Sequence, residues 1–347
     1  MSITLDNPPD ETISDLAFSP SGNYIAASSW DGTARIWELN DTFTNQQYKF
    51  KASEKQEAIT RIAWDPDGSK LYYGTTEAKI KSLDNNSGKT DEIANLAPCG
   101  RISGLKYSEA TNGLIAATAR GYIILVFPDK SEPKLIFDPN NSKTGTSTMA
   151  DLSIINIAVG QNYLFFIGNH TTPKPDLSPT DQVFYSGNLT PANGIFEVKP
   201  VNHQLTSQLM ALAVSQDDQE WVIGSITGQI EYKSENDTET KVEKGHRNDT
   251  TKDMYAVNCL AFSPERPFIA SGGGDSSIIF ISPRNKRFKA IKGNGKTPTA
   301  IAFSYNNGAL AIATGYDYSQ GSSAYYKSRE QNPPEIIIKK LTQTDYV

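Results

Sequence analysis

The sequence predicts an all-β fold in which seven small sheets form a closed ring, a β-propeller. Three observations support this prediction. A short unit of strands and tight turns recurs along the chain, and its interval is that of a propeller blade. The two chain ends also carry strand-forming segments that lack partners of their own.

The clearest copy of the unit is residues 13–39, ISDLAFSPSGNYIAASSWDGTARIWEL, which predicts three strands in series. The first strand, Ile13 to Phe18, alternates apolar and polar residues and ends at a Ser-Pro-Ser-Gly turn. The second, Tyr24 to Ser29, ends at Asp31-Gly32, a dipeptide that favours a tight hairpin, and the third is Ala34 to Leu39. Three strands cannot bury two apolar faces alone, so the unit must stack on copies of itself.

Further copies of the unit follow at regular intervals. The aromatic or apolar residue that ends each first strand marks them: Phe18, Trp64, Tyr107, Val214, Phe262 and Phe303. Four of the five intervals are 41 to 48 residues long, close to the roughly 40–45 residues of a four-stranded blade. The interval between the third and fourth markers fits two blades. We therefore expect a degenerate fourth blade, with two strands over residues 154–168 and the others at 182–188 and 194–198, and seven blades in all.

Two segments lie outside the repeated pattern. Residues 170–181, HTTPKPDLSPTD, contain three prolines and predict an exposed insertion in the fourth blade. The last unit has only three strands, ending with residues 335–341 (EIIIKKL), while residues 2–5 precede the first blade. Pairing these two ends would remove the open sheet edges of the ring. We expect residues 1–347 to form a single propeller closed by the N-terminal strand.

Composition excludes several classes of function. The net charge of −6 argues against coating nucleic acid through an overall positive field. Only Cys99 and Cys259 occur, so the sequence predicts no disulfide framework and favours a reducing compartment. The first residues do not form a signal peptide, and polar residues interrupt the most apolar run, 152–168, so no membrane span is predicted.

The sequence offers no pattern typical of catalysis, metal binding or a cofactor. The three histidines have no cysteine neighbour and no metal-ligand spacing. Gly272-Gly273-Gly274-Asp275 is not followed by a predicted helix, so it does not predict a phosphate-binding loop. Aspartates such as Asp31 and Asp275 are expected to hold turns rather than to act as acids or bases. We expect no enzymatic activity, no metal and no cofactor.

One run stands out as basic in this acidic chain. Residues 283–296, PRNKRFKAIKGNGK, contain Phe288 and no acidic residue. Basic side chains interleaved with an aromatic ring suit single-stranded RNA, because the charges contact phosphates and the ring stacks on a base. The alternative is a charged turn between blades. The candidate RNA-binding residues are Arg284, Lys286, Arg287, Lys289 and Lys292.

Ser28 to Gly32 followed by Arg35-Ile36-Trp37 resembles a WD repeat. Several segments, in order along almost the whole chain, are similar to one family, the nuclear-pore-associated mRNA-export WD-repeat factors: 7–18, 28–37, 224–232, 245–247, 253–264 and 315–321. A close relative of that family is the spindle-checkpoint WD-repeat adaptor. The segment Tyr316 to Gly321, YDYSQG, is more similar to the export factor. The resemblance implies a WD40-type propeller in the nucleus, at the nuclear pore and envelope, and partly in the cytoplasm.

The resemblance also implies a partner and a binding face. Members of the family bind a segment called GLEBS, which is carried by an FG-repeat nucleoporin or by checkpoint kinases. Trp30 corresponds to an aromatic anchor for that segment, and Arg247 to an arginine that pairs with one of its glutamates. Gln229 stands where many members have arginine, which implies a weaker or different clamp. The alternatives for Trp30 and Arg247 are packing between blades and a solvated loop.

Two other functions remain as alternatives. A spindle-checkpoint adaptor would use the same face to bind a mitotic kinase. A propeller enzyme would need several carboxylates or histidines at the inner ends of its strands, and the sequence does not cluster them.

Overall fold

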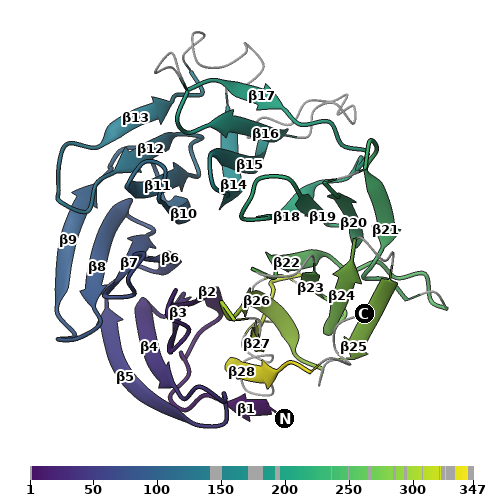
Figure 1. Ribbon diagram of the computed structural model, residues 1–347, viewed down its shortest axis with the longest axis horizontal. Helices are drawn as coiled ribbons and strands as arrows, with labels where there is room; N and C mark the ends of the chain where they lie inside the picture. Colours follow the sequence, from purple (N-terminus) through teal and green to yellow (C-terminus); the bar gives the residue numbers. More distant parts are fainter. Residues whose placement is uncertain are drawn as a thin grey trace.

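The computed structural model describes residues 2–140, 151–170, 183–191, 196–235, 237–248, 250–264, 268–283, 287–292, 295–306, 308–319, 321, 325 and 333–342. In these residues, 28 strands form seven four-stranded antiparallel sheets arranged in a ring (Figure 1). The sequence prediction of a seven-bladed WD40-type propeller is confirmed.

The blades are numbered in chain order, and each is written from the channel outward. Blade 1 consists of β2 (Ile13–Phe18), β3 (Tyr24–Ser29), β4 (Thr33–Leu39) and β5 (Gln46–Ser53). Blade 2 consists of β6 (Ile59–Trp64), β7 (Lys70–Thr75), β8 (Lys79–Asp84) and β9 (Thr90–Asn95). Blade 3 consists of β10 (Ile102–Ser108), β11 (Gly113–Thr118), β12 (Ile123–Val126) and β13 (Lys134–Phe137).

The remaining blades follow the same plan. Blade 4 consists of β14 (Leu152–Val159), β15 (Tyr163–His170), β16 (Val183–Asn188) and β17 (Val198–Pro200), and blade 5 of β18 (Leu209–Val214), β19 (Trp221–Ser225), β20 (Gln229–Lys233) and β21 (Lys241–Lys244). Blade 6 consists of β22 (Val257–Phe262), β23 (Ile269–Gly273), β24 (Ser277–Ser282) and β25 (Arg287–Lys292). Blade 7 consists of β26 (Thr297–Phe303), β27 (Ala309–Gly315), β28 (Glu335–Lys340) and β1 (Ser2–Thr4).

The hairpin between β3 and β4 forms at the predicted Asp31-Gly32 dipeptide. Gly32 has a φ of 78°, in the region that favours glycine. A Cβ atom there would lie 2.6 Å from the carbonyl oxygen of Glu57 and 2.7 Å from that of Glu54. The chain leading to blade 2 therefore passes directly beside this turn, and only glycine fits.

The degenerate fourth blade exists, but its outer strand is shifted. The predicted strand at 194–198 is replaced by β17, which begins at Val198. Phe196 is buried instead, and its ring covers Gly187 so closely that a Cβ on that glycine would lie 2.5 Å from it. Because the Phe196 ring packs over Gly187, the strand β17 starts later than predicted, at Val198. Of the predicted insertion at 170–181, His170 ends β15, and residues 171–181 lie outside the described residues.

The ring closes as predicted. β1 pairs antiparallel with β28, with Ile3 opposite Ile338, and the Leu5 amide donates to the Ile336 carbonyl at 2.9 Å. Leu5 is only 2% exposed. The N-terminal segment thus completes blade 7 and leads directly into blade 1.

The apolar core is divided among the blade interfaces. Seven clusters of buried side chains occur in the described part of the chain, and each combines residues of two neighbouring blades. The cluster around Leu5 and Trp37, for example, also contains Ile336 and Ile338. A blade is therefore stabilised mainly by its neighbours, as expected of a repeat that cannot bury both faces alone. No helix among the described residues has the length and apolar character to cross a membrane.

The contribution of ring closure to the stability of the fold can be tested with Leu5→Ala. Removal of a buried leucine side chain should lower the free energy of unfolding by about 2–5 kcal/mol. Leu135→Ala in the outer strand β13 is the matched control, because Leu135 is 51% exposed. Denaturant titration monitored by circular dichroism measures both variants, and equal effects of the two substitutions would contradict the role assigned to closure.

Candidate functional site

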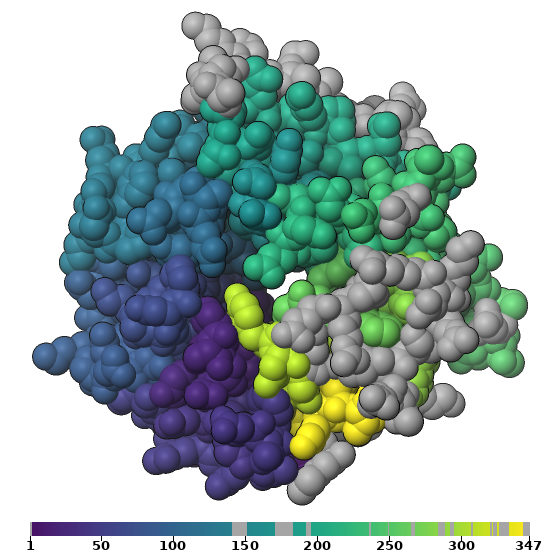
Figure 2. Space-filling model, viewed as in Figure 1, coloured from purple at the N-terminus to yellow at the C-terminus, as the bar shows by residue number. Residues whose placement is uncertain are grey.

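The seven innermost strands begin at the same mouth of the central channel. A cavity of about 340 Å³ opens there, and residues from the start of every innermost strand line it. These residues are Ile13, Thr60, Ile102, Ile155, Met210, Asn258 and Thr299. Figure 2 shows a hollow at the centre of the ring. We call the surface around this mouth the channel face; it is formed by the β-hairpins between second and third strands and by the connections between blades.

Trp30 lies on the channel face. It directly follows β3 and its backbone amide donates to the Thr12 carbonyl at 3.1 Å. Its side chain is 43% exposed and lines the cavity. The other three tryptophans of the chain, Trp37, Trp64 and Trp221, are buried. Trp30 therefore presents an accessible ring at the rim of the channel.

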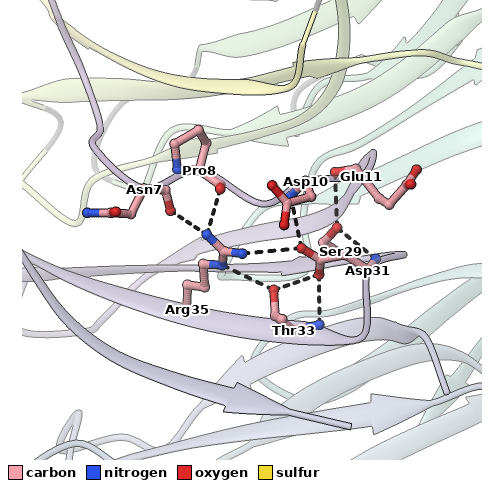
Figure 3. A network of polar contacts seen from close by, with 8 residues as sticks. All are labelled: Asn7, Pro8, Asp10, Glu11, Ser29, Asp31, Thr33 and Arg35. Carbon is pink, nitrogen blue, oxygen red and sulfur yellow. Dashed lines mark hydrogen bonds and ion pairs between the residues drawn. The ribbon is translucent and has the colours of Figure 1, made fainter. Parts of the chain in front are cut away.

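A buried guanidinium holds the hairpin that carries Trp30 (Figure 3). Arg35 donates through Nη1 to the carbonyl oxygens of Asn7 at 2.7 Å and Pro8 at 2.6 Å. Its Nη2 lies 3.3 Å from Oδ2 of Asp31. The same carboxylate accepts from the Asp10 amide at 2.9 Å, and its Oδ1 accepts from the Thr33 amide at 2.8 Å. This Arg35–Asp31 network fastens the hairpin to the N-terminal segment and confirms the turn-holding role expected for Asp31.

Arg247 lies in the connection between β21 and β22, which also belongs to the channel face. It forms an isolated β-bridge with Met254, and the Asn248 amide donates to the Asp253 carbonyl at 2.9 Å. The Arg247 side chain is half-buried, whereas Met254 is exposed. The described residues of this connection, 245–248 and 250–255, thus form a compact loop. We call it the Arg247 loop.

Glycine makes the close approach of this loop possible. Gly228 has a φ of 75°, and a Cβ there would lie 2.3 Å from the His246 carbonyl oxygen. Gly228 also accepts hydrogen bonds from the amides of Gly245 and His246, both at 3.0 Å. The hairpin before β20 and the Arg247 loop are therefore in direct contact.

Gln229 begins β20 in that same hairpin. It is half-buried, it is opposite Lys244 in the strand register, and its Oε1 accepts a hydrogen bond from Thr227 Oγ1 at 3.4 Å. The structure thus brings Gln229 beside the Arg247 loop, and both lie on the same channel face as Trp30.

His246 is a structural residue that sequence reasoning missed. It is fully buried; its Nδ1 lies 2.8 Å from Oδ1 of Asp275, and its Nε2 lies 2.8 Å from Oγ of Ser271. Asp275 also accepts from the Ser277 amide at 3.1 Å, so it holds its turn as predicted. The Gly-His dipeptide before blade 6, followed by Asp275 at the hairpin, was the available signal. This His246–Asp275 network anchors the base of the Arg247 loop.

The network also sets the charge of Asp275. Burial disfavours the ionised carboxylate, but the hydrogen bond and charge of His246 and the bonds from Ser277 outweigh it and hold the pKa of Asp275 below its ordinary value. An ionised carboxylate only accepts, so Nδ1 of His246 carries the proton.

None of the described residues of the basic run lines the channel cavity. The run's residues form or flank β25, the outermost strand of blade 6. Lys289 is half-buried in that strand, and Arg287 and Lys292 belong to it, although their side chains lie outside the described residues. Arg284 and Lys286 lie outside the described residues altogether. Lys296, at the end of the run, forms an ion pair with Glu335 at 2.7 Å.

Within the described ranges, no three His, Cys, Asp or Glu side chains gather closely enough to hold a metal ion. Cys259 is buried, and burial raises the pKa of its thiol to about 12. Such a thiol is protonated and unreactive at neutral pH.

The His246–Asp275 network predicts a pH-dependent stability. Because the pKa of Asp275 is lowered by folding, its stabilisation is complete above the unfolded value of about 3.9 and is lost as the pH falls through the lower folded value. Asp275→Asn should therefore destabilise the protein by about 1–3 kcal/mol at neutral pH. The difference from the unsubstituted protein should shrink below about pH 4. Urea titrations across this pH range measure it, and a pH-independent difference would contradict the assignment.

Comparison with known proteins agrees with the fold. A family model described as "WD domain, G-beta repeat" matches residues 3–38 and 238–282, which contain the two polar networks. The solved "Structure of U3-55K" superimposes with a TM-score of 0.72 and covers 98% of both chains, at 12% sequence identity, which supports the fold alone.

Two relatives match nearly the whole chain. The "Poly(A)+ RNA export protein" of Schizosaccharomyces pombe is 24% identical over 350 residues, covering 99% of this chain and 91% of the relative. The "mRNA export factor GLE2" of Chaetomium thermophilum is 25% identical over 349 residues, covering 97% of this chain and 89% of the relative. The resemblance found in the sequence is confirmed. This chain is a WD-repeat protein homologous, over nearly its whole length, to the poly(A)+ RNA and mRNA export factors.

Proposed function

We propose that this protein is a non-enzymatic scaffold that binds a GLEBS segment of an FG-repeat nucleoporin and supports mRNA export through the nuclear pore. One observation carries the proposal: an exposed tryptophan and the Arg247 loop share the channel face of a rigid ring. The names of the full-length relatives supply the biological process.

The two side chains suit an acidic and apolar segment. A half-exposed indole offers a large contact area at low entropic cost. A guanidinium can donate two parallel hydrogen bonds to one carboxylate, a contact that is stronger where water is partly excluded. Trp30 would anchor an apolar residue of the segment, and Arg247 would pair with one of its glutamates.

The arrangement favours recognition over catalysis. The described lining of the channel cavity includes one carboxylate, Asp317, and no histidine. A propeller enzyme would need several such groups facing the channel. We infer that the protein acts in the nucleus, at the nuclear pore and envelope, and partly in the cytoplasm, since docking to a nucleoporin would place it there.

Contact with single-stranded RNA along β25 is the weaker part of the proposal. The run of residues 283–296 is basic and contains Phe288, but Ile281, opposite Phe288 in the register, is aliphatic and offers no second ring for stacking.

Lys289→Glu should weaken binding to a single-stranded RNA oligonucleotide uniformly across sequences and reduce the salt dependence of that binding, because one phosphate contact is lost. Filter binding at several salt concentrations measures this, and an unchanged salt slope would remove β25 from the RNA proposal.

The central test is Arg247→Glu. This charge reversal should abolish binding of a GLEBS peptide in calorimetry, because a carboxylate of the peptide would face another carboxylate. Lys89→Glu is the matched control: it makes the same charge change at an exposed position in the turn between β8 and β9, at the opposite end of blade 2. Melting curves of both variants establish that they are folded. Unchanged affinity of the Arg247 variant would refute the assigned face.

A substitution at Gln229 tests the same face through a gain in GLEBS affinity. Gln229→Arg adds a cation beside the Arg247 loop and should tighten GLEBS binding by up to about tenfold, the effect of one additional charge-assisted contact. Weaker binding would show that Gln229 itself is matched to a divergent partner. Calorimetry with the same peptide makes the comparison.

The alternative is a spindle-checkpoint adaptor that binds a kinase GLEBS segment on the same face. A pull-down from cell extract distinguishes the two. Recovery of checkpoint kinases without nucleoporins would reverse the proposal.

A further inference from the structure

The cavity at the channel mouth contains two arginines that none of the comparisons assigns to a site. Arg61 is the third residue of β6 and Arg101 immediately precedes β10, and both line the cavity together with Trp30. Apart from Asp317, the rest of the lining carries no charge. It includes the aromatic and polar residues Tyr316, Tyr318, Asn258, Thr12 and Thr60 and the apolar residues Ile13, Ile102, Ile155 and Met210.

Arg61 is held in place by neutral groups only. Its Nη1 donates to the carbonyl oxygens of Thr60 at 2.8 Å and Ser14 at 3.4 Å, and its Nη2 donates to that of Ile155 at 3.4 Å. The guanidinium therefore reaches from blade 2 to backbone atoms of blades 1 and 4. Its orientation is fixed, and its charge is not neutralised by any of these contacts.

Neither arginine forms an ion pair with a carboxylate of the described residues. Burial lowers the pKa of Arg61, the charge of Asp15 partly offsets this, and the charge of Arg101 lowers it further. The two cations thus repel each other within one cavity. An anion between them would relieve the repulsion and supply the missing counter-charge.

We propose that the channel mouth is a second binding point, in which Arg61 and Arg101 take the side-chain carboxylate of an extended acidic peptide. The Trp30 ring, at the same rim, would cover the neighbouring peptide residue. The site is separate from the Arg247 loop, whose residues do not line the cavity, and it does not depend on the nucleoporin proposal.

The charge balance favours a peptide carboxylate over a polyphosphate or nucleic acid. Two arginines face one carboxylate, Asp317, which already accepts from the Ser319 amide at 3.0 Å. Among the residues that line the cavity, the surplus is a single positive charge, in a chain whose net charge is −6. Asp15, which does not line the cavity, offsets part of the charge of Arg61 from outside it. An extended peptide can place one carboxylate there and keep its other charges in solvent, whereas the densely charged chain of a polyphosphate or a nucleic acid would be repelled by the rest of the molecule. The aromatic rim offers apolar contacts to the flanking residues.

Trp30 is a natural reporter for the experiment, because it is the exposed tryptophan among three buried ones. The probe is acetylated tetraglutamate amide, with the tetraglutamine analogue as the neutral control and inorganic phosphate as the alternative anion. Binding of tetraglutamate should protect Trp30 fluorescence from acrylamide quenching, and the tetraglutamine control should not.

Three variants locate the binding. Arg101→Gln, at an exposed position, should weaken tetraglutamate binding about tenfold, as expected for the loss of one charge-assisted contact. Arg61→Gln should weaken it similarly, and melting curves establish whether this variant folds. Lys89→Gln, at an exposed position on the opposite face, should leave Trp30 protection unchanged. The proposal is overturned if tetraglutamate does not protect Trp30, if phosphate protects it equally well, or if the Arg101 substitution weakens binding no more than the Lys89 substitution does.

Discussion

The pairing of β1 with β28 is the constraint on which the channel face depends. Without it, β28 would expose an unpaired edge and blade 7 would lack its fourth strand. The residues that follow β1 also support the channel face, because the carbonyl oxygens of Asn7 and Pro8 hold Arg35, and Arg35 holds the Asp31 hairpin next to Trp30. One N-terminal segment thus closes the ring and positions Trp30, the proposed aromatic anchor.

In blades 1 and 6 the hairpin between the second and third strands is fastened by an aspartate, but the side chain that binds the aspartate differs. In each, an aspartate at the hairpin between the second and third strands binds a cationic or proton-donating group. In blade 6 the partner is His246, from the connection that precedes the blade, whereas in blade 1 it is Arg35, from within β4. Arginine suits blade 1 because its longer side chain also reaches the backbone carbonyls of the N-terminal segment. Both networks lie directly beneath candidate binding residues, so the face is rigid where it is proposed to bind.

Local signals were sufficient to predict most of the ring from sequence. Apolar alternation located β2, and the run of strand-forming residues after it located β3. The Asp31-Gly32 dipeptide located the hairpin between β3 and β4, and the recurrence interval located the fourth blade. The outer strands were harder, because a strand such as Gln46–Ser53 carries polar residues on both faces and resembles a loop. The start of β17 depended on Phe196 packing over Gly187, a contact that no local pattern records.

The candidate site was only partly predictable for the same reason. Trp30 and Arg247 were found through resemblance to a family, whereas the His246–Asp275 network requires two separate segments to meet, the connection before blade 6 and the β23–β24 hairpin. Arg61 and Arg101 gained meaning only when the ring brought the first residues of β6 and β10 to one mouth. Sequence patterns describe each blade well, but the properties of the channel arise from all blades together.

The central claim is that the channel face, and not the opposite face or the outer rim, receives the partner. Hydrogen–deuterium exchange with and without a GLEBS peptide tests it most directly. The account predicts protection confined to the hairpin carrying Trp30, the Arg247 loop and the hairpin before β20. Protection confined to the turns of the opposite face, such as that between β8 and β9, would contradict it.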